Sequence, residues 1–328
     1  VAMESTGVYW IALFEVLERE GFQTYLIDPR QTKQVPGRKT DILDCQWIQV
    51  LHSYGLLRPS FRPDDAICVL RSYLRQRVML IDHAGQHVQH MQKAMQQMNV
   101  KLSVVLDDIT GVTGMRIIDA ILGGERDPRK LATLRDERCK NDEATIAKAL
   151  EGNWRDDHLF ALKQAVDLYR YYHVLMVELD ERLAGYLETF EDKSEGKTAP
   201  PKPSRKRRRN ELSFDVHQLL FRMTGMDLTV IDGLDAYALL KLISETGTDM
   251  SRWPTEKHFT SWLTLCPGSR QSGSYRKGKT RRSTNRAATV FRLAAQSVGR
   301  TQTALGAFYR RMKARLGAPK AITATAHK

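Results

Sequence analysis

Three serines in the stretch CPGSRQSGSYRKGKTRR, residues 266–282, lie among six arginines and lysines and no carboxylate. A serine hydroxyl becomes a good nucleophile when a base removes its proton, or when a cation stabilises its alkoxide and the charge developing on the attacked group. The basic residues supply positive potential, but no histidine lies nearby to act as a base. The stretch therefore fits a catalytic serine and a phosphate-binding serine equally well. The three candidates are Ser269, Ser272 and Ser274.

Three acids near the beginning of the sequence form a second candidate set. Asp41 and Asp44 stand three residues apart in KTDILDCQWIQVL, so a helix would place both carboxylates on one face. Glu4 lies where an apolar run ends, a position at which α/β sheets present functional side chains. Neighbouring carboxylates favour a cation between them, and Mg²⁺ prefers such hard oxygen ligands. A solvated acidic helix start is the competing interpretation, and on spacing alone it is the better one.

The elements expected around these acids follow a β-α-β order. VAMEST is typical of the end of a buried strand, GVYWIALFEVLEREG of a helix closed by Gly21, and TYLID of a second strand. A further helix is expected from about Lys39 to Gly55, and it would carry Asp41 and Asp44.

Two long helical stretches fill the middle of the chain. From Ile67 to Leu102, apolar residues recur in alternating steps of three and four, broken by Arg77. A second stretch from Leu162 to Phe190 repeats this pattern with polar interruptions, among them Asp180. The two stretches predict either an antiparallel helix pair or a dimerising coiled coil.

Two smaller features of the helical middle carry weaker signals. His83, His87 and His90 have helical spacing, but they flank the apolar seam among glutamines, so we expect an exposed polar face and no zinc site. The turns at residues 109–115 and 231–235 resemble helix-hairpin-helix elements, whose glycine amides can hold a phosphate. Asp235 would repel a phosphate, so we interpret the second turn as structural.

The charge of the chain is concentrated at its C-terminal end. The whole chain has a net charge of +13, and the segment from Leu265 onwards contains 15 lysines and arginines and no acid. Such a localised field favours a nucleic-acid partner through electrostatic steering and counterion release. A second basic run ends the segment EDKSEGKTAPPKPSRKRRRN, whose composition predicts an unfolded connector.

The cysteines and the apolar segments bear on the compartment. The four cysteines are scattered without a paired motif, which predicts free, reduced thiols. The apolar run VYWIALFEVL is too short to cross a membrane. We therefore expect a cytoplasmic protein.

Both ends of the sequence resemble the DEDD transposases of the insertion-sequence-110/1111 family, relatives of the Piv and MooV recombinases. The matching stretches are VAMESTGVYW with LIDPRQTKQVPGRKTDILDCQWIQVL, and SWLTLCPGSRQSG onwards to residue 328. The resemblance implies a RuvC-like, RNase-H-type Mg²⁺ site of four acids, in which Glu4, Asp41 and Asp44 match the second, third and fourth. The first acid lies on an upstream strand in that family, so we expect this chain to be truncated at its N-terminus and its sheet to lack the opening strands.

The same resemblance selects one serine. In 1111-type relatives, the nucleophile is a serine five residues after a turn proline and followed by a small residue, which points here to Ser272, between Pro267 and Gly273. Ser272 is then expected to attack a DNA phosphodiester beside the Mg²⁺ site of another subunit and to form a transient phosphoserine link. The cations expected to bind nucleic acid are Arg270, Arg276, Lys277, Lys279, Arg281, Arg282 and Arg286.

The family resemblance also implies partners: DNA, a structured noncoding guide RNA that selects sites by base pairing, and further copies of the chain in a dimer or tetramer. The implied setting is the bacterial nucleoid. Two other functions fit the residues: a metal-dependent junction nuclease, in which Ser272 only binds phosphate, and an inactive nucleic-acid-binding remnant.

The predicted fold class is α/β plus α. It comprises a partial RuvC-like domain, a coiled-coil helical region, a flexible basic linker and a mostly helical transposase domain. The predicted bounds of these parts are residues 1–62, 63–190, 191–212 and 213–328.

Overall fold

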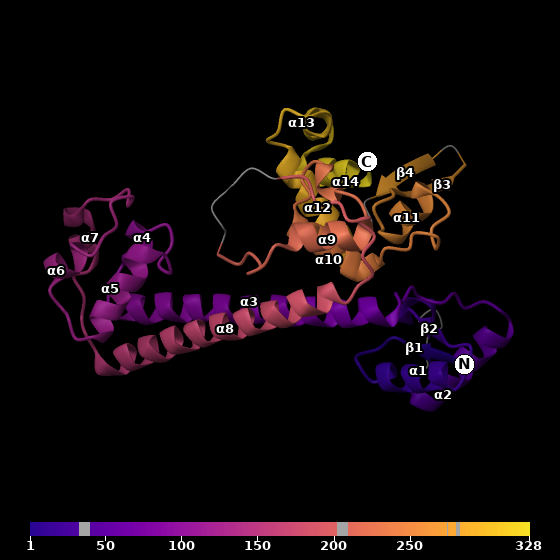
Figure 1. Ribbon diagram of the computed structural model, residues 1–328, viewed down its shortest axis with the longest axis horizontal. Coiled ribbons are helices and arrows are strands. Elements are labelled where there is room, and N and C mark those ends of the chain that lie inside the picture. Colours follow the sequence, from indigo (N-terminus) through magenta and orange to yellow (C-terminus); the bar gives the residue numbers. More distant parts are fainter. Residues whose placement is uncertain (33–39, 202–208, 274, 280–282) are drawn as a thin grey trace. The chain divides into compact units, whose positions relative to one another are not determined.

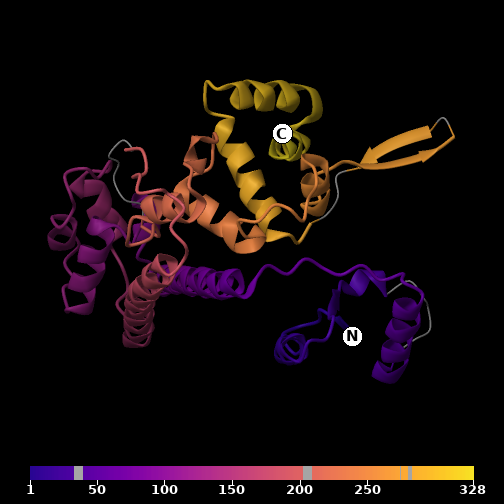
Figure 2. The ribbon, with the colours of Figure 1, turned by 45° about the vertical axis from the view of Figure 1, so that its right-hand side comes forward.

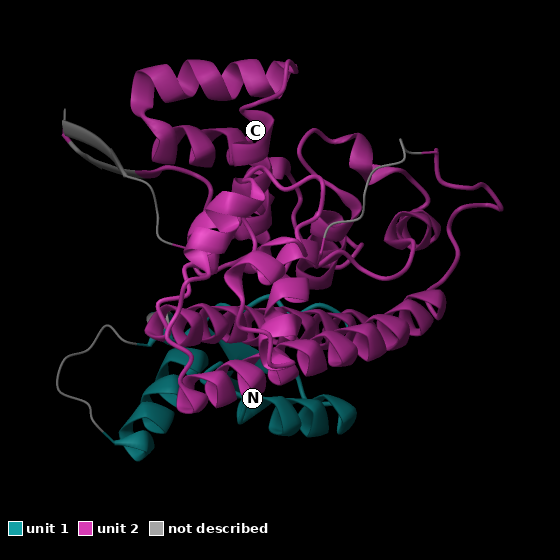
Figure 3. Ribbon diagram, turned by 90° about the vertical axis from the view of Figure 1, so that its left-hand side faces the viewer, with its two compact units in different colours: residues 1–64 teal, residues 65–328 magenta. Residues whose placement is uncertain are grey.

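The chain divides into two compact units, residues 1–64 and residues 65–328, which Figure 3 colours separately. The first is a small mixed α/β unit, and the second is helical apart from one two-stranded hairpin. This layout agrees with the predicted combination of α/β and helical parts. The computed structural model describes residues 1–32, 40–201, 209–273, 275–279 and 283–328.

The first unit is built on a two-stranded parallel sheet. Strand β1 (Ala2–Glu4) pairs with β2 (Tyr25–Ile27), and helix α1 (Trp10–Arg19) connects them (Figure 1). A short 3-10 turn, η1 (Pro29–Gln31), follows, and α2 (Asp41–Ser53) completes the unit. The β-α-β order and the following helix are those predicted from the sequence.

Helix α2 packs against this sheet through a small apolar cluster. Ile27, Leu51 and Leu57 are buried, and Trp47 of α2 packs against them. The chain then returns alongside β2, where the Ser60 amide donates to the Leu26 carbonyl at 2.6 Å. The cluster and the hydrogen bond together fix α2 next to the sheet, although the unit buries few residues.

The second unit contains two 33-residue helices, α3 (Asp65–Gln97) and α8 (Asp156–Glu188), each about 50 Å long. They run antiparallel in Figure 1, with the Tyr186 hydroxyl donating to the Ala66 carbonyl at one end. Of the two arrangements left open by the heptad pattern, the structure shows an antiparallel pair within one chain. The predicted seam positions of α3 are buried or half-buried, whereas the rest of the helix is rich in glutamine.

The polar interruptions of the two heptad patterns meet inside this helix pair. Arg77 and Asp180 are each 2% exposed and form a bidentate ion pair at 2.5 and 3.1 Å. Arg77 also donates to the Asn210 carbonyl and the Tyr237 hydroxyl, each at 3.1 Å. Burial alone would lower the pKa of Arg77, but the hydrogen bonds and the charge of Asp180 outweigh it and raise that pKa. Asp180 also accepts the Ser213 amide at 2.9 Å, so the network joins both helices to the chain that follows them.

Four short helices cap the end of the pair at which α3 finishes: α4 (Leu102–Val105), α5 (Val112–Leu122), α6 (Pro128–Ala132) and α7 (Glu143–Ala149). Their apolar side chains form one core with the adjoining halves of the two long helices. Among the described residues, no helix has the combination of length and apolar character that crossing a membrane requires.

The segment after α8 was expected to be an unfolded connector. Its described part, residues 191–201, has no helix or strand but is held on a neighbouring helix, α9 (Val216–Thr224). The Lys193 amide donates to the Arg222 carbonyl at 2.7 Å, and the Ala199 amide donates to the Gln218 side chain at 2.9 Å. The segment thus has no regular secondary structure but makes specific hydrogen bonds to α9.

In its described residues, the C-terminal half of the second unit contains six α-helices, one 3-10 helix and the hairpin. After α9 these are η2 (Leu228–Val230), α10 (Ala236–Thr246), α11 (Glu256–Trp262), β3 (Gly268–Ser272), β4 (Tyr275–Lys279), α12 (Arg286–Val298), α13 (Ala304–Leu316) and α14 (Ala318–His327). Helices α9, α10 and α12 share a core with one end of the long helix pair, where α3 starts and α8 ends.

The turn before α10 is structural, as predicted. Asp235 is the N-cap of α10 and accepts the Ala238 amide at 2.8 Å. Gly233 has a φ of +83°, and a Cβ on it would lie 2.8 Å from the Ala294 carbonyl oxygen and 2.7 Å from a methyl of Val298. The turn therefore packs its backbone directly on α12, which requires glycine at this position.

Candidate active site

The serine-containing stretch forms an antiparallel hairpin. Strands β3 and β4 pair in register from Gly268 opposite Lys279 to Ser272 opposite Tyr275, and Figure 2 shows them side by side. Gly273 follows with a φ of +58°, the left-handed conformation that tight hairpin connections require. The sequence did not predict these strands because strands are usually recognised by apolar residues at every second position. This stretch is polar throughout and lacks that pattern.

The register determines which positions share a face of the hairpin. Opposed residues of an antiparallel pair lie on the same side, and alternate residues along a strand do as well. Ser272 and Arg270 therefore occupy the same face, and Lys277 pairs with Arg270 across the strands. Ser269 and Arg276 occupy positions on the other face. Of the two candidate serines on the described strands, Ser272 is thus the one on the face of the Arg270–Lys277 pair.

Both ends of the hairpin join well-packed chain. Leu263 and Leu265 before β3, and Ala287 and Ala288 of α12, form a buried cluster. Asn285 caps α12 by accepting the Ala288 amide at 3.2 Å, and its side chain donates to the Trp262 carbonyl at 3.4 Å. Packed residues of α12 and of the chain just after α11 thus flank the hairpin in the sequence.

The predicted nucleic-acid-binding cations fall into three groups. Arg270, Arg276, Lys277 and Lys279 lie on the two strands, whose backbone and register are described. Arg281 and Arg282, like Ser274, lie outside the described residues. Arg286 is exposed and begins α12. A cation at this end of a helix opposes the helix dipole, so helix stability does not explain Arg286.

Glu4 lies at the end of β1, as predicted, and its carboxylate is held by hydroxyls. Thr6 donates to one carboxylate oxygen and Thr32 lies 3.5 Å from the other. Thr32 in turn accepts the indole N–H of Trp47 through its carbonyl at 3.3 Å. A chain of contacts thus runs from Glu4 to the helix that carries Asp41 and Asp44.

Asp41 and Asp44 occupy the first turn of α2, which Thr40 caps by accepting the Leu43 amide at 3.3 Å. Both are exposed, and Trp47 lies one turn further along the same helix. The donors are hard oxygens of the kind that suits Mg²⁺. Across the described ranges, however, no group of three or more Asp, Glu, His or Cys side chains is gathered closely enough to hold a metal ion. The three-acid Mg²⁺ site remains a prediction.

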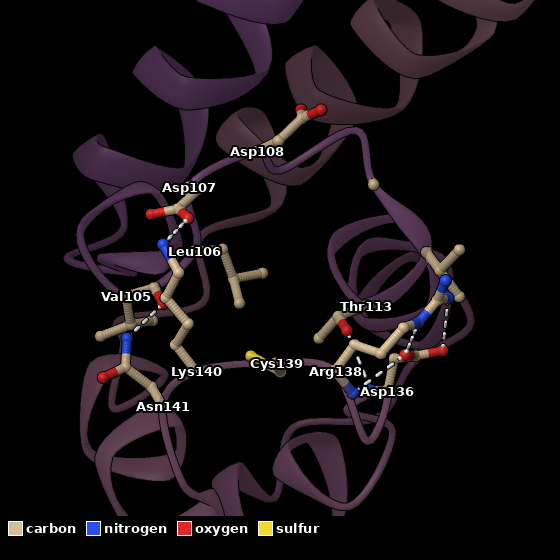
Figure 4. Close-up of a pocket in the computed structure, with 12 residues that line it drawn as sticks. Val105, Leu106, Asp107, Asp108, Thr113, Asp136, Arg138, Cys139, Lys140 and Asn141 are labelled. Carbon is tan, nitrogen blue, oxygen red and sulfur yellow. Dashed lines mark hydrogen bonds and ion pairs between the residues drawn. The ribbon is translucent and has the colours of Figure 1, made fainter. Parts of the chain in front are cut away.

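The glycine turn before α5 borders a pocket of about 310 Å³, seen in Figure 4. Gly114 lies so close to the backbone of Ile109 that a Cβ would be 2.0 Å from its carbonyl oxygen, which explains the glycine. The cations of the pocket are already paired, Arg138 with Asp136 at 2.7 Å and Lys140 with Asp107 at 2.6 Å. This turn therefore offers little free positive charge to a phosphate.

The three histidines of α3 stack and do not gather around a common point. His83 and His87 lie against Tyr172 of α8, with ring centroids 5.5 and 5.4 Å apart, and His87 meets His90 edge-on. The pKa of His87 is lowered, first by burial and then by the two neighbouring imidazoles. The exposed polar face expected for these histidines holds for His90, whereas His83 and His87 are half-buried against α8.

Comparison with known protein families shows which family this chain belongs to. Residues 1–100 match the DEDD transposase model of IS110, described as a transposase, and residues 227–310 match the transposase IS116/IS110/IS902 family. The two models describe the same family and together cover more than half of the 328 residues. The chain belongs to the IS110 family of transposases. Glu4, Asp41 and Asp44 lie within the first match, and the serine hairpin lies within the second. No curated protein matches the chain.

As an IS110-family transposase, the protein has DNA as its partner. The sequence identified both regions that the family models match, but it missed the hairpin and the pairing of Arg77 with Asp180. Gly273, directly after Ser272, was the available signal for a hairpin turn. The polar interruptions of the two heptad patterns, at Arg77 and Asp180, were the signal for the ion pair.

Proposed function

We propose that this IS110-family transposase cuts and rejoins DNA through a covalent phosphoserine intermediate at Ser272. The main support for this proposal is the register of the hairpin. In that register Ser272 belongs to the last strand pair and lies on the same face as positions 270 and 277, which are Arg and Lys. Positive charge at those positions would bind the DNA phosphate and stabilise the negative charge that develops as the serine attacks.

In this proposal, Glu4, Asp41 and Asp44 hold Mg²⁺, which would supply Lewis-acid stabilisation at the reacting phosphate. The support is the series of contacts from Glu4 through Thr32 to Trp47, because it ties the end of β1 to the helix bearing the two aspartates. These acids and Ser272 belong to different compact units. As the family resemblance implies, the acids of one subunit would act beside Ser272 of another in a dimer or tetramer.

A guide RNA completes the proposal. Segment 265–328 carries 15 basic residues and no acid, far more charge than a single serine site needs. Backbone contacts through such a surface bind nucleic acid without reading its sequence, so site choice would rest on base pairing with a structured noncoding RNA.

The test is a search for the covalent intermediate. Purified full-length protein is incubated with Mg²⁺, labelled DNA carrying the gene with its flanking sequence, and RNA transcribed from those flanks. Denaturing electrophoresis should reveal a protein–DNA adduct, and Ser272→Ala should abolish it while DNA binding in a filter assay persists. Ser269→Ala is the matched control on the same strand and should retain the adduct.

Each other outcome has a distinct meaning. Cleaved DNA without any adduct would support a metal-dependent nuclease that uses water, and it would refute the serine intermediate. An adduct that survives Ser272→Ala but disappears in Ser269→Ala would move the nucleophile to the other face of the hairpin.

A further inference from the structure

A second feature of the C-terminal half is an apolar pocket of about 300 Å³ between α11, α12 and α14. It is separate from the serine hairpin in sequence. Its apolar walls include two aromatic rings, Phe259 and Phe291, whose centroids are 6.1 Å apart at an interplanar angle of 81°. The volume is at the lower end of the range for ligand pockets, so a single small ring system is a better match than a large cofactor.

An unsatisfied hydroxyl lies in the wall of this pocket. Thr325 of α14 is only 5% exposed, and its Oγ1 is buried without a hydrogen-bond partner among the described residues. Leaving a buried polar atom unpaired costs free energy, and such atoms usually have a protein, water or ligand partner. Thr323, two residues earlier on the same helix, donates to the Pro319 carbonyl at 3.2 Å and is satisfied.

The lining of the pocket carries side chains of both charges. Asp232 and Glu256 line it together with His327 and Lys328, and within the described ranges neither carboxylate has a hydrogen-bond or ion-pair partner. The carboxylates accept hydrogen bonds from N–H groups, and the lysine donates to carbonyl oxygens or ring nitrogens. The pocket therefore fits a planar group that has both hydrogen-bond donors and acceptors on its edge.

We propose that this pocket receives an unstacked nucleobase of the nucleic acid that the transposase handles. A base can stack its flat face on one of the two nearly perpendicular rings and meet the other edge-on. It also offers amino or ring N–H groups to the carboxylates of the lining and a polar atom to Thr325. Its phosphates stay outside, where cations of segment 265–328 are available. The inference rests on the proposed function only in requiring that the chain bind nucleic acid.

The alternative occupant is an aromatic side chain from a protein, including a second copy of this chain. An aromatic side chain fills apolar volume equally well. Phenylalanine brings no polar edge to satisfy Thr325 and the two carboxylates of the lining together, and tyrosine and tryptophan bring a single donor. A base brings several polar atoms on one edge, which is why we favour it.

The test compares binding of two fluorescent single-stranded oligonucleotides by full-length protein, one of mixed sequence and one of equal length made of abasic units. Two variants alter the pocket: Ala295→Leu fills it, and Thr325→Val removes the hydroxyl without changing shape. Each should weaken binding of the intact oligonucleotide, by about tenfold for Ala295→Leu, as expected for loss of one stacked base. Neither should change binding of the abasic oligonucleotide.

The controls separate pocket loss from damage to the fold. Thr323→Val removes a satisfied hydroxyl from the same helix and should bind both oligonucleotides like the parent. Because Thr325 lacks a partner, Thr325→Val should not lower the melting temperature, so its loss of binding would have no folding explanation. Replacing single bases by 2-aminopurine should give one position whose fluorescence rises on binding to the parent protein and not to Ala295→Leu.

The remaining outcomes overturn the inference. If the parent binds both oligonucleotides and the pocket variants do the same, the base pocket is wrong while nucleic-acid binding stands. If Thr325→Val weakens both oligonucleotides equally, or if Ala295→Leu changes only self-association in light scattering, the pocket does not hold a base. If the parent binds neither oligonucleotide at low salt, the proposed function itself fails.

Discussion

At the scale of single residues, the buried pair of Arg77 and Asp180 is the feature with the largest expected effect on stability. A buried ion pair contributes little relative to a well-packed apolar replacement, because removing both charges from water is costly. Losing one partner is different, since the other charge is left buried and unpaired. Arg77 also binds the Asn210 carbonyl, and Asp180 binds the Ser213 amide, so the pair fixes the chain that re-enters after the basic connector.

We expect Asp180→Asn to destabilise the protein by about 3 to 5 kcal/mol, as measured by urea unfolding, because Arg77 keeps its charge without a counterion. Arg75→Met is the matched control on the same helix. Arg75 is 45% exposed and pairs with Glu245 at 3.0 Å, so its loss should cost about 1 kcal/mol or less. Equal effects of the two changes would contradict the role given to burial.

At the scale of elements, the packing of the turn before α10 on α12 depends on a glycine. Gly233 and Gly124 both have positive φ, at +83° and +100°. A Cβ atom added to Gly233 would lie within 3 Å of the Ala294 carbonyl oxygen and of a methyl group of Val298. A Cβ atom added to Gly124 would have no neighbour within 4 Å. The two positions therefore separate the cost of backbone strain from the cost of a steric clash.

Gly124→Ala should cost about 1 kcal/mol, the strain of a side chain in the left-handed region. Gly233→Ala should cost about 1 to 3 kcal/mol more, because the clash forces the turn away from α12 or distorts both elements. Thermal unfolding of the two variants under one set of conditions measures the difference. Similar losses in both would mean that α12 moves freely to accept the methyl group.

The elements also show what the sequence could predict. The β-α-β order and the apolar seam of α3 could be predicted from the spacing of apolar residues. Buried positions recur about every 2 residues in a strand and about every 3.6 residues in a helix. The hairpin of Ser272 did not, because its strands lack an apolar face. The partner of Arg77 is 103 residues away, and pairing across that distance is set by how the two long helices align. For the candidate site, residue types and the spacing from the turn proline pointed to the serine and the acids. No local sequence pattern predicted where these residues lie in three dimensions.

At the scale of the whole molecule, the positive charge is concentrated in one segment of the chain. The net charge of +13 is less than the +15 carried by the segment from Leu265 onwards, so the rest of the chain is nearly neutral. Nucleic acid should therefore bind mainly through this segment, with the long helix pair contributing little electrostatic attraction. Because each phosphate contact releases a condensed counterion, the salt dependence of binding counts the cations that touch the backbone.

Arg286 provides the sharpest test of this division, because it is exposed and lies at the helix end where a cation is unfavourable for stability. Arg286→Gln should reduce the slope of log affinity against log salt by about 1, with little dependence on the sequence of the DNA. Lys163→Gln, on α8, removes an exposed cation that pairs with Asp167 at 2.6 Å and should leave the slope unchanged. Melting temperatures should not fall in Arg286→Gln, since the change relieves an unfavourable dipole interaction. An equal reduction of the slope in both variants would mean that DNA also follows the helix pair, and the basic segment would then be only part of a longer binding surface.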